Sequence, residues 1–202
     1  MAISNGYCTL AEAKEQLGID SSDSTEDSFI EPLVEAASRE IDAFTGQFFH
    51  SASSETRYYT SFDGVYVYVD PIQSLTALTS DADNDNTYET TWATTGSDYR
   101  YRLEPVNAST NSESYWRLHA ITANWPTTSA AIKAAGTFGW ATVPKQIREA
   151  CLLQTARLFV RRSAPFGIVE AQDGGMMQVR GGLDRQVKEL IERYRAPTMM
   201  FA

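Results

Sequence analysis

The first apolar pattern along the chain is short and carries its own start and stop signals. In "TLAEAKEQLGID", residues 9–20, Thr9 can cap a helix start, and Glu12 three residues later completes a capping box. Gly18 suits the end of such a helix, because glycine adopts the left-handed conformation at low cost. The pattern predicts a short helix between these residues.

A second, longer pattern repeats every three or four residues and predicts a helix with one apolar face. Pro32 leaves two starts open: a regular helix from near Ile30, or a helix from near Thr25 whose first turns are bent by the proline. Thr45-Gly46 is expected to end it. The apolar face consists of Phe29, Ile30, Leu33, Val34, Ala37, Ile41 and Phe44.

From Glu55 onward the pattern changes to the alternation typical of strands. "TRYYTSFDGVYVYVD" alternates around Asp63-Gly64 and predicts a β-hairpin at that turn. Five more β-like runs follow, and together they predict six or seven short strands, arranged as a small antiparallel sheet or a barrel-like unit over residues 55–140. The runs are "IQSLTALTS", "NTYETTWATT", "DYRYRLEPV", "SYWRLHAI" and "SAAIKAAGTFGW".

Helical patterning returns at Pro144, which is expected to occupy the first helical position because its missing N–H is not needed there. Apolar residues cover most of the circumference of this helix, which Arg161, Arg162 and Pro165 finish. Such a helix must be covered on more than one side, by other helices and by either the β-rich insertion or an adjacent subunit. The apolar residues are Ile147, Ala150, Cys151, Leu152, Leu153, Ala156, Leu158, Phe159 and Val160.

The remaining sequence predicts a glycine-bearing arm, a last helix and a loose tail. "LDRQVKELIERYRA" has the apolar stripe Leu183, Val187, Leu190, Ile191 and Tyr194. We therefore expect an α+β fold: a small helical bundle formed by N- and C-terminal helices, with an inserted antiparallel β-rich subdomain. The expected parts are N-terminal helices at 1–54, the β-rich subdomain at 55–140, and C-terminal helices at 141–202 with an arm (164–182) and a tail (196–202).

Charge is unevenly distributed along a chain whose net charge is −9. Residues 1–50 carry ten acids and two bases, 51–143 ten acids and five bases, and 144–202 six acids and ten bases. Strong net acidity argues against wrapping nucleic acid by neutralising its phosphates. An acidic front and a basic back favour stacking of copies on one another, or else they are simply solvated helix faces.

Two cysteines and the absence of targeting patterns suggest a cytoplasmic product. Cys8 and Cys151 have no Cys or His at metal-ligand spacing, and are expected to be small buried side chains in a reducing compartment. No secretory signal and no apolar run of ~20 residues is visible, so no membrane partner is expected.

Motifs for catalysis are missing from the sequence. His50 and His119, the only histidines, stand beside no nucleophile motif, and no phosphate-binding glycine loop is present. Asp81–Trp92 partly matches a calcium loop but lacks its glycine and final glutamate, so a polar hairpin tip is favoured. We expect no catalytic, cofactor-binding or metal site, and no enzyme; a carboxylate hydrolase would need two acids ~5–9.5 Å apart, which nothing indicates.

Aromatic residues are concentrated in the β-rich segment. They could stack on a sugar or base, although aromatics that alternate on strands more commonly pack a sheet. This leaves an alternative function, a β-domain that binds glycan or protein and is mounted on a helical base. The residues are Tyr58, Tyr59, Tyr66, Tyr68, Tyr99, Tyr101, Tyr115 and Trp116.

Three motifs in order carry a family resemblance. "TLAEAKEQLGID…FIEPLVEAASREIDAFTG", "GTFGWATVPKQIREACLLQTARLFVRRSAPFG" and "GGLDRQVKELIERYR" resemble the corresponding parts of the head–tail connector (adaptor) proteins of long-tailed bacteriophages, over about residues 8–46 and 136–195. The shortest family members are nearly all helical, so the β-rich middle departs from them.

The resemblance implies a structural virion protein, assembled in the host cytoplasm. Such proteins form a ring, expected to be dodecameric, between the portal and a tail-side neck or tail-completion protein, and they extend the DNA channel. An acidic lumen would let DNA pass without specific binding. Residues expected at the subunit or portal interface are Arg157, Arg161, Arg162, Arg195, Met199, Met200 and Phe201.

Overall fold

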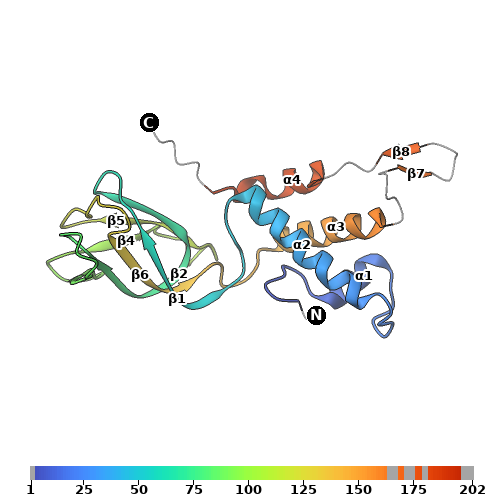
Figure 1. Ribbon diagram of the computed structural model, residues 1–202, viewed down its shortest axis with the longest axis horizontal. Helices are drawn as coiled ribbons and strands as arrows, with labels where there is room; N and C mark the ends of the chain where they lie inside the picture. The colour runs from blue at the N-terminus through green and yellow to red at the C-terminus, as the bar shows by residue number, and fades with distance from the viewer. Residues whose placement is uncertain (1–2, 163–167, 171–175, 179–181, 197–202) are drawn as a thin grey trace. The chain divides into compact units, whose positions relative to one another are not determined.

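The computed structural model describes residues 3–162, 168–170, 176–178 and 182–196. The chain divides into two compact units (Figure 1). Residues 1–48 and 143–202 form a helical unit, and residues 49–142 form a sheet unit. The predicted α+β class is confirmed, because helices from both ends of the chain share one unit while the middle of the chain forms an antiparallel sheet.

Helix α1 (Leu10–Leu17) has the predicted caps at both ends. The Thr9 hydroxyl accepts a hydrogen bond from the Glu12 backbone N–H at 3.2 Å, and the Thr9 N–H donates to the Glu12 carboxylate at 2.9 Å. Gly18 ends the helix at φ 70°, in the left-handed region. The capping box therefore satisfies two N–H groups that no helical carbonyl can reach.

Helix α2 (Asp27–Thr45) begins at Asp27 and contains Pro32, so of the two predicted starts the one near Thr25 is slightly closer than the one near Ile30. Gly46 ends the helix at φ 71°, as predicted. The predicted apolar face is confirmed in its centre, where Ile30, Val34, Ala37 and Ile41 are fully buried. Phe29, Leu33 and Phe44 are only partly covered at its margins.

Helix α3 (Lys145–Arg161) differs from its prediction in two respects. Pro144 is the N-cap rather than the first helical residue. The helix contacts α1, α2 and α4, but it buries only one face, which includes two polar residues: Ile147, Ala150, Cys151, Gln154 and Thr155. The other apolar residues are half-buried, except Val160, which is exposed.

The C-terminal segment adds helix α4 (Arg185–Ile191) and a single 3-10 turn, η1 (Glu192–Tyr194). The predicted stripe is confirmed at Val187, Ile191 and Tyr194, which are buried. Within the predicted arm, β7 (Ile168–Glu170) and β8 (Met176–Gln178) form an antiparallel pair. The rest of the predicted arm before Gly182 and the predicted tail after Ala196 lie outside the described residues.

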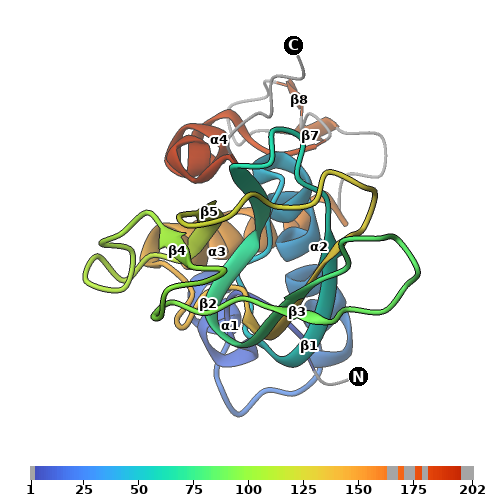
Figure 2. The same cartoon turned by 90° about the vertical axis from the view of Figure 1, so that its left-hand side faces the viewer.

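The sheet unit contains six strands in the order β1-β6-β2-β5-β4, with β3 paired to β2. Figure 2 labels strands β1 to β5 of this sheet. All pairs of strands are antiparallel, which confirms the predicted small antiparallel sheet. The strands are β1 (Ala52–Tyr59), β2 (Tyr66–Ser80), β3 (Thr90–Thr91), β4 (Tyr101–Glu104), β5 (Tyr115–Ala120) and β6 (Ile132–Phe138).

The hairpin predicted at Asp63-Gly64 is wrong. The turn itself forms: Gly64 has φ 72°, and the Asp63 carboxylate accepts hydrogen bonds from the N–H groups of Val65 and Tyr66 at 2.8 and 2.7 Å. The strands on either side of it do not pair in the ladder, because β6 lies between β1 and β2. Alternation along a strand predicts which residues face the core, but it does not select the neighbouring strand.

Strand β2 merges two of the predicted runs across Pro71. Its first part pairs with β5 and its second part with β6, and the register shifts between Tyr68 and Ile72. Proline has no N–H to donate to a ladder, so it is tolerated where the pairing of a strand is irregular. The Pro71 carbonyl still accepts a hydrogen bond, from the Gly139 N–H at 2.6 Å.

Candidate assembly surface

Two of the arginines predicted at an interface hold the helical unit together. Arg157 of α3 forms an ion pair with Asp184, the N-cap of α4. Arg162 forms an ion pair with Glu26 and lies over the Phe29 ring, 4.8 Å from its centre. Both side chains therefore have partners within their own unit.

Arg161 lies between these arginines and behaves differently. It is exposed, and no hydrogen bond, ion pair or ring contact joins it to any residue in the described part of the chain. Val160 beside it is 49% exposed, which is high for an aliphatic side chain on a packed helix. The last turn of α3 thus offers a cation and an apolar group side by side on the surface.

Arg195, another residue predicted at the interface, also has partners within the helical unit. It pairs with Glu192 at 3.3 Å and lies 5.5 Å from the centre of the Phe44 ring. Met199, Met200 and Phe201 lie outside the described residues, so their expected interface role stays a prediction.

The acidic N-terminal and basic C-terminal segments face one another inside one unit. Arg148 of α3 pairs with Glu12 of α1 at 3.0 Å, and Gln154 donates a hydrogen bond to Glu40 of α2 at 2.6 Å. The Arg148–Glu12 and Arg162–Glu26 ion pairs therefore neutralise part of the charge asymmetry within the helical unit. This weakens the hypothesis that an acidic front stacks on the basic back of another copy.

In the sheet unit, the aromatic residues pair mainly with neighbouring side chains. The Tyr68 and Trp116 rings stack with their centres 6.1 Å apart, and Tyr66 lies 4.7 Å from the His119 ring. These pairs join β2 to β5, which are adjacent in the sheet. The arrangement favours sheet packing over a stack of free rings for a sugar or base. Tyr58, 52% exposed, still lies within 5.6 Å of Tyr88.

A charged cluster around Glu104 was not predicted. The Glu104 carboxylate on β4 accepts hydrogen bonds from Arg117 at 2.9 Å and Arg102 at 3.1 Å, and lies 3.2 Å from His119 Nδ1. Burial alone would raise the pKa of Glu104, but the hydrogen bonds from the arginines outweigh it and lower that pKa. The cluster resembles no catalytic pair, because its one carboxylate is held by cations. Sequence alone gave no sign of it, since its members become neighbours only through the pairing of β4 with β5.

Four carboxylates gather at the loop between β2 and β3. Ligand oxygens of Asp81, Asp83, Asp85 and Glu89 lie within 4.8 Å of one another. The two Asp81 oxygens accept backbone N–H groups, from Asn84 at 2.7 Å and Asn86 at 2.8 Å. The charge of Asp85 raises the pKa of Asp83. The β2–β3 pairing around this loop favours the predicted polar hairpin tip.

The two cysteines, expected to be small buried side chains, lie together. Cys8 Sγ and Cys151 Sγ are 3.4 Å apart, and both residues are buried free thiols. The prediction of burial is confirmed, but spacing along the sequence could not reveal that they are neighbours.

No helix in the described ranges is long and apolar enough to cross a membrane.

Residues 7–95, which include α1, α2 and β1 to β3, match the family of phage gp6-like head-tail connector proteins. No curated protein matches the chain significantly.

Two solved structures share the fold along the whole chain. One is a chain in the neck of an empty gene transfer agent (GTA) particle computed with C6 symmetry, with a TM-score of 0.60 and 20% identity. The other is a chain in the virion of a native GTA particle, with a TM-score of 0.59 and 21% identity. Each comparison covers 100% of this chain and 96% of the other. The resemblance to phage head–tail connector proteins that the sequence predicted is thus confirmed, by the family model over residues 7–95.

Proposed function

We propose that this chain is a structural, non-enzymatic protein of the neck of a phage-like particle, where copies of it form a ring that helps to join head to tail. The match of residues 7–95 to the connector family is the observation that carries the proposal. The fold shared with chains of GTA neck and virion structures supports it.

The finer parts of the proposal are the ring stoichiometry, the neighbours and the path of DNA. A dodecameric ring would contact the portal on one side and a tail-side neck or tail-completion protein on the other. DNA would pass through the lumen without specific binding, since a net charge of −9 repels phosphates.

Ring closure requires two different, complementary patches on each copy. The paired arginines of α3 are already occupied within the helical unit, which leaves the exposed last turn with Arg161 as a candidate for one patch. The opposing patch would have to offer a carboxylate and an apolar contact.

Native mass spectrometry of the full chain, alone and mixed with the portal protein of the same particle, tests the proposal. We expect either a closed ring of identical subunits or a monomer that assembles in many copies on the portal. A protein that stays monomeric under both conditions would argue against a neck role.

A further inference from the structure

Cys8 and Cys151 come from opposite ends of the chain and meet inside the helical unit. Cys8 lies in the segment that precedes α1, and Cys151 lies on the buried face of α3. Their sulfur atoms are 3.4 Å apart, although 143 positions separate the residues in sequence. Cys8 is 5% exposed and Cys151 is not exposed at all.

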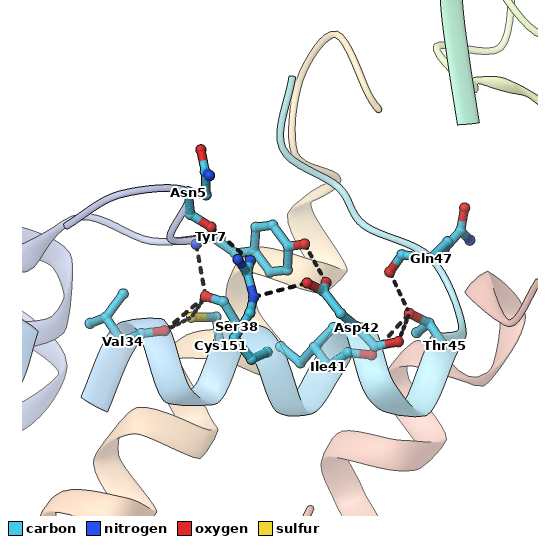
Figure 3. A network of polar contacts seen from close by, with 10 residues as sticks. Asn5, Tyr7, Val34, Ser38, Ile41, Asp42, Thr45, Gln47 and Cys151 are labelled. Atoms are coloured by element: carbon cyan, nitrogen blue, oxygen red, sulfur yellow. Dashed lines mark hydrogen bonds and ion pairs between the residues drawn. The ribbon is translucent and has the colours of Figure 1, made fainter. Parts of the chain in front are cut away.

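Hydrogen bonds to α2 position the Cys151 sulfur and the residue that precedes Cys8. The Tyr7 N–H donates to the Ser38 hydroxyl at 3.1 Å, and that hydroxyl donates to the Val34 carbonyl at 2.8 Å (Figure 3). The same hydroxyl lies 3.4 Å from Cys151 Sγ. The Tyr7 side chain adds a hydrogen bond to Asp42. The residue next to Cys8 is therefore anchored to the same turn of α2 that contacts Cys151.

We propose that Cys8 and Cys151 form a dithiol site that a small two-electron oxidant converts into an intramolecular disulfide. One S–S bond forms as two S–H bonds break. With a diazene such as diamide, the two electrons and two protons pass to its N=N bond, which becomes a hydrazine. With a disulfide oxidant such as oxidised glutathione, the two electrons and two protons reduce its S–S bond, which gives two thiols.

The two sulfurs are not equivalent in this reaction. The hydrogen bond between the thiols, with help from Ser38, lowers the pKa of Cys151. The same hydrogen bond and burial raise the pKa of Cys8. Because the thiolate is the nucleophile, Cys151 attacks the oxidant to form a covalent adduct. The Cys8 sulfur then attacks Cys151 Sγ, forms the disulfide and releases the reduced oxidant. Local opening of the segment before α1 admits the reagent, so the reaction is slower than for an exposed thiol.

The cross-link would fasten the N-terminal segment to α3. A disulfide that closes so long a loop restricts the unfolded chain strongly, so the oxidised helical unit should melt roughly 10 °C higher than the reduced one. Reduction should restore the lower melting temperature.

The test treats the native full-length protein with diamide, blocks the remaining thiols by alkylation, and analyses it by intact and tryptic mass spectrometry without reduction. We expect a monomer lighter by two hydrogen atoms, in which the peptides of residues 1–14 and 149–157 are linked. Dithiothreitol should separate them. Cys8→Ser, the matched control, should form no intramolecular link.

Two results would overturn the proposal. In the first, alkylation still modifies both thiols after the native protein has been treated with diamide, and the Cys8–Cys151 disulfide forms only in denaturant. In the second, the disulfide joins two chains instead of two residues of one chain. If Cys8→Ser does not fold, the comparison of native and denatured wild type decides the matter by itself.

Discussion

Arg161 is the arginine at the end of α3 whose change should affect assembly with the least damage to the fold. Its neighbours Arg157 and Arg162 pair with Asp184 and Glu26, so reversing their charge would also remove ion pairs inside the helical unit. Arg161 has no such partner in the described part of the chain. We expect Arg161→Glu to abolish the homo-oligomer, or assembly on the portal, as measured by native mass spectrometry.

The matched control for this charge reversal is Arg185→Glu. The Arg185 side chain is 91% exposed on α4 and pairs with Glu189 one turn away. It should leave both assembly and far-UV circular dichroism unchanged. Intact rings in Arg161→Glu would remove the last turn of α3 from the proposed interface.

Glu104 should make the stability of the sheet unit depend on pH. Its pKa is lowered in the folded protein, so the stabilisation it contributes is fully present above the ordinary value near 4.5 and is lost as pH falls through the lowered pKa. Glu104→Gln leaves Arg117 and Arg102 without their carboxylate. We expect it to reduce the free energy of unfolding by about 1–3 kcal/mol at neutral pH, and by less in acid.

Tryptophan fluorescence measures this effect selectively, since all four tryptophans lie in the sheet unit. Urea unfolding at pH ~7 and at pH ~3, well below the ordinary carboxylate pKa, gives the two free energies. Glu113→Gln, which changes an exposed carboxylate in the same way, should have little effect. Equal losses at both pH values would mean that the Glu104 charge is not what matters.

At the scale of elements, β6 depends on a glycine where it packs against β2. A Cβ at Gly136 would lie 2.2 Å from the Ser74 carbonyl oxygen and 2.9 Å from Leu75 Cα, both of which are backbone atoms. Gly136→Ala should therefore push β2 away and cost about 1–3 kcal/mol in urea unfolding followed by fluorescence. Thr137→Ala, the neighbouring control, should cost less. An unchanged Gly136→Ala protein would contradict the close approach.

The helices could be predicted from sequence because their signals are local. The capping box of α1 and the apolar stripe of α2 involve residues within one or two turns of each other. The sheet could be predicted only as a set of strands. Nothing near Asp63 indicates that β6, some seventy residues further along, comes between β1 and β2.

The sequence predicted which residues make up the candidate site, but not which side chains these residues contact. The basic end of α3 is visible in the sequence, but the partners that occupy Arg157 and Arg162 come from α4 and the start of α2. The contact between Cys8 and Cys151 was likewise not predictable from sequence, because the packing of α3 brings together residues that lie far apart in the chain. Which arginine stays available can be found only once these partners are placed.

For the whole molecule, the C-terminal tail is expected to dock on the portal, and its deletion should begin after Ala196. The Ala196 N–H donates to the Thr45 carbonyl at 2.7 Å, so removing that residue would disturb the end of α2. Deleting residues 197–202 should weaken portal attachment in a pull-down assay while leaving the thermal unfolding unchanged. Normal attachment of the shortened protein would contradict a contact between the tail and the portal.

The two compact units imply that the sheet can be removed from the chain as an independent folding unit. The ends of residues 49–142 lie close together: Ala52 pairs with Phe138, and the Phe49 and Trp140 rings are 5.6 Å apart. Closely spaced ends are the condition under which an inserted domain folds without its host. We expect the fragment 49–142 to unfold in urea with the midpoint that fluorescence gives for the full chain. A fragment without a cooperative transition would show instead that the sheet needs the helical unit, and that the chain is one folding unit.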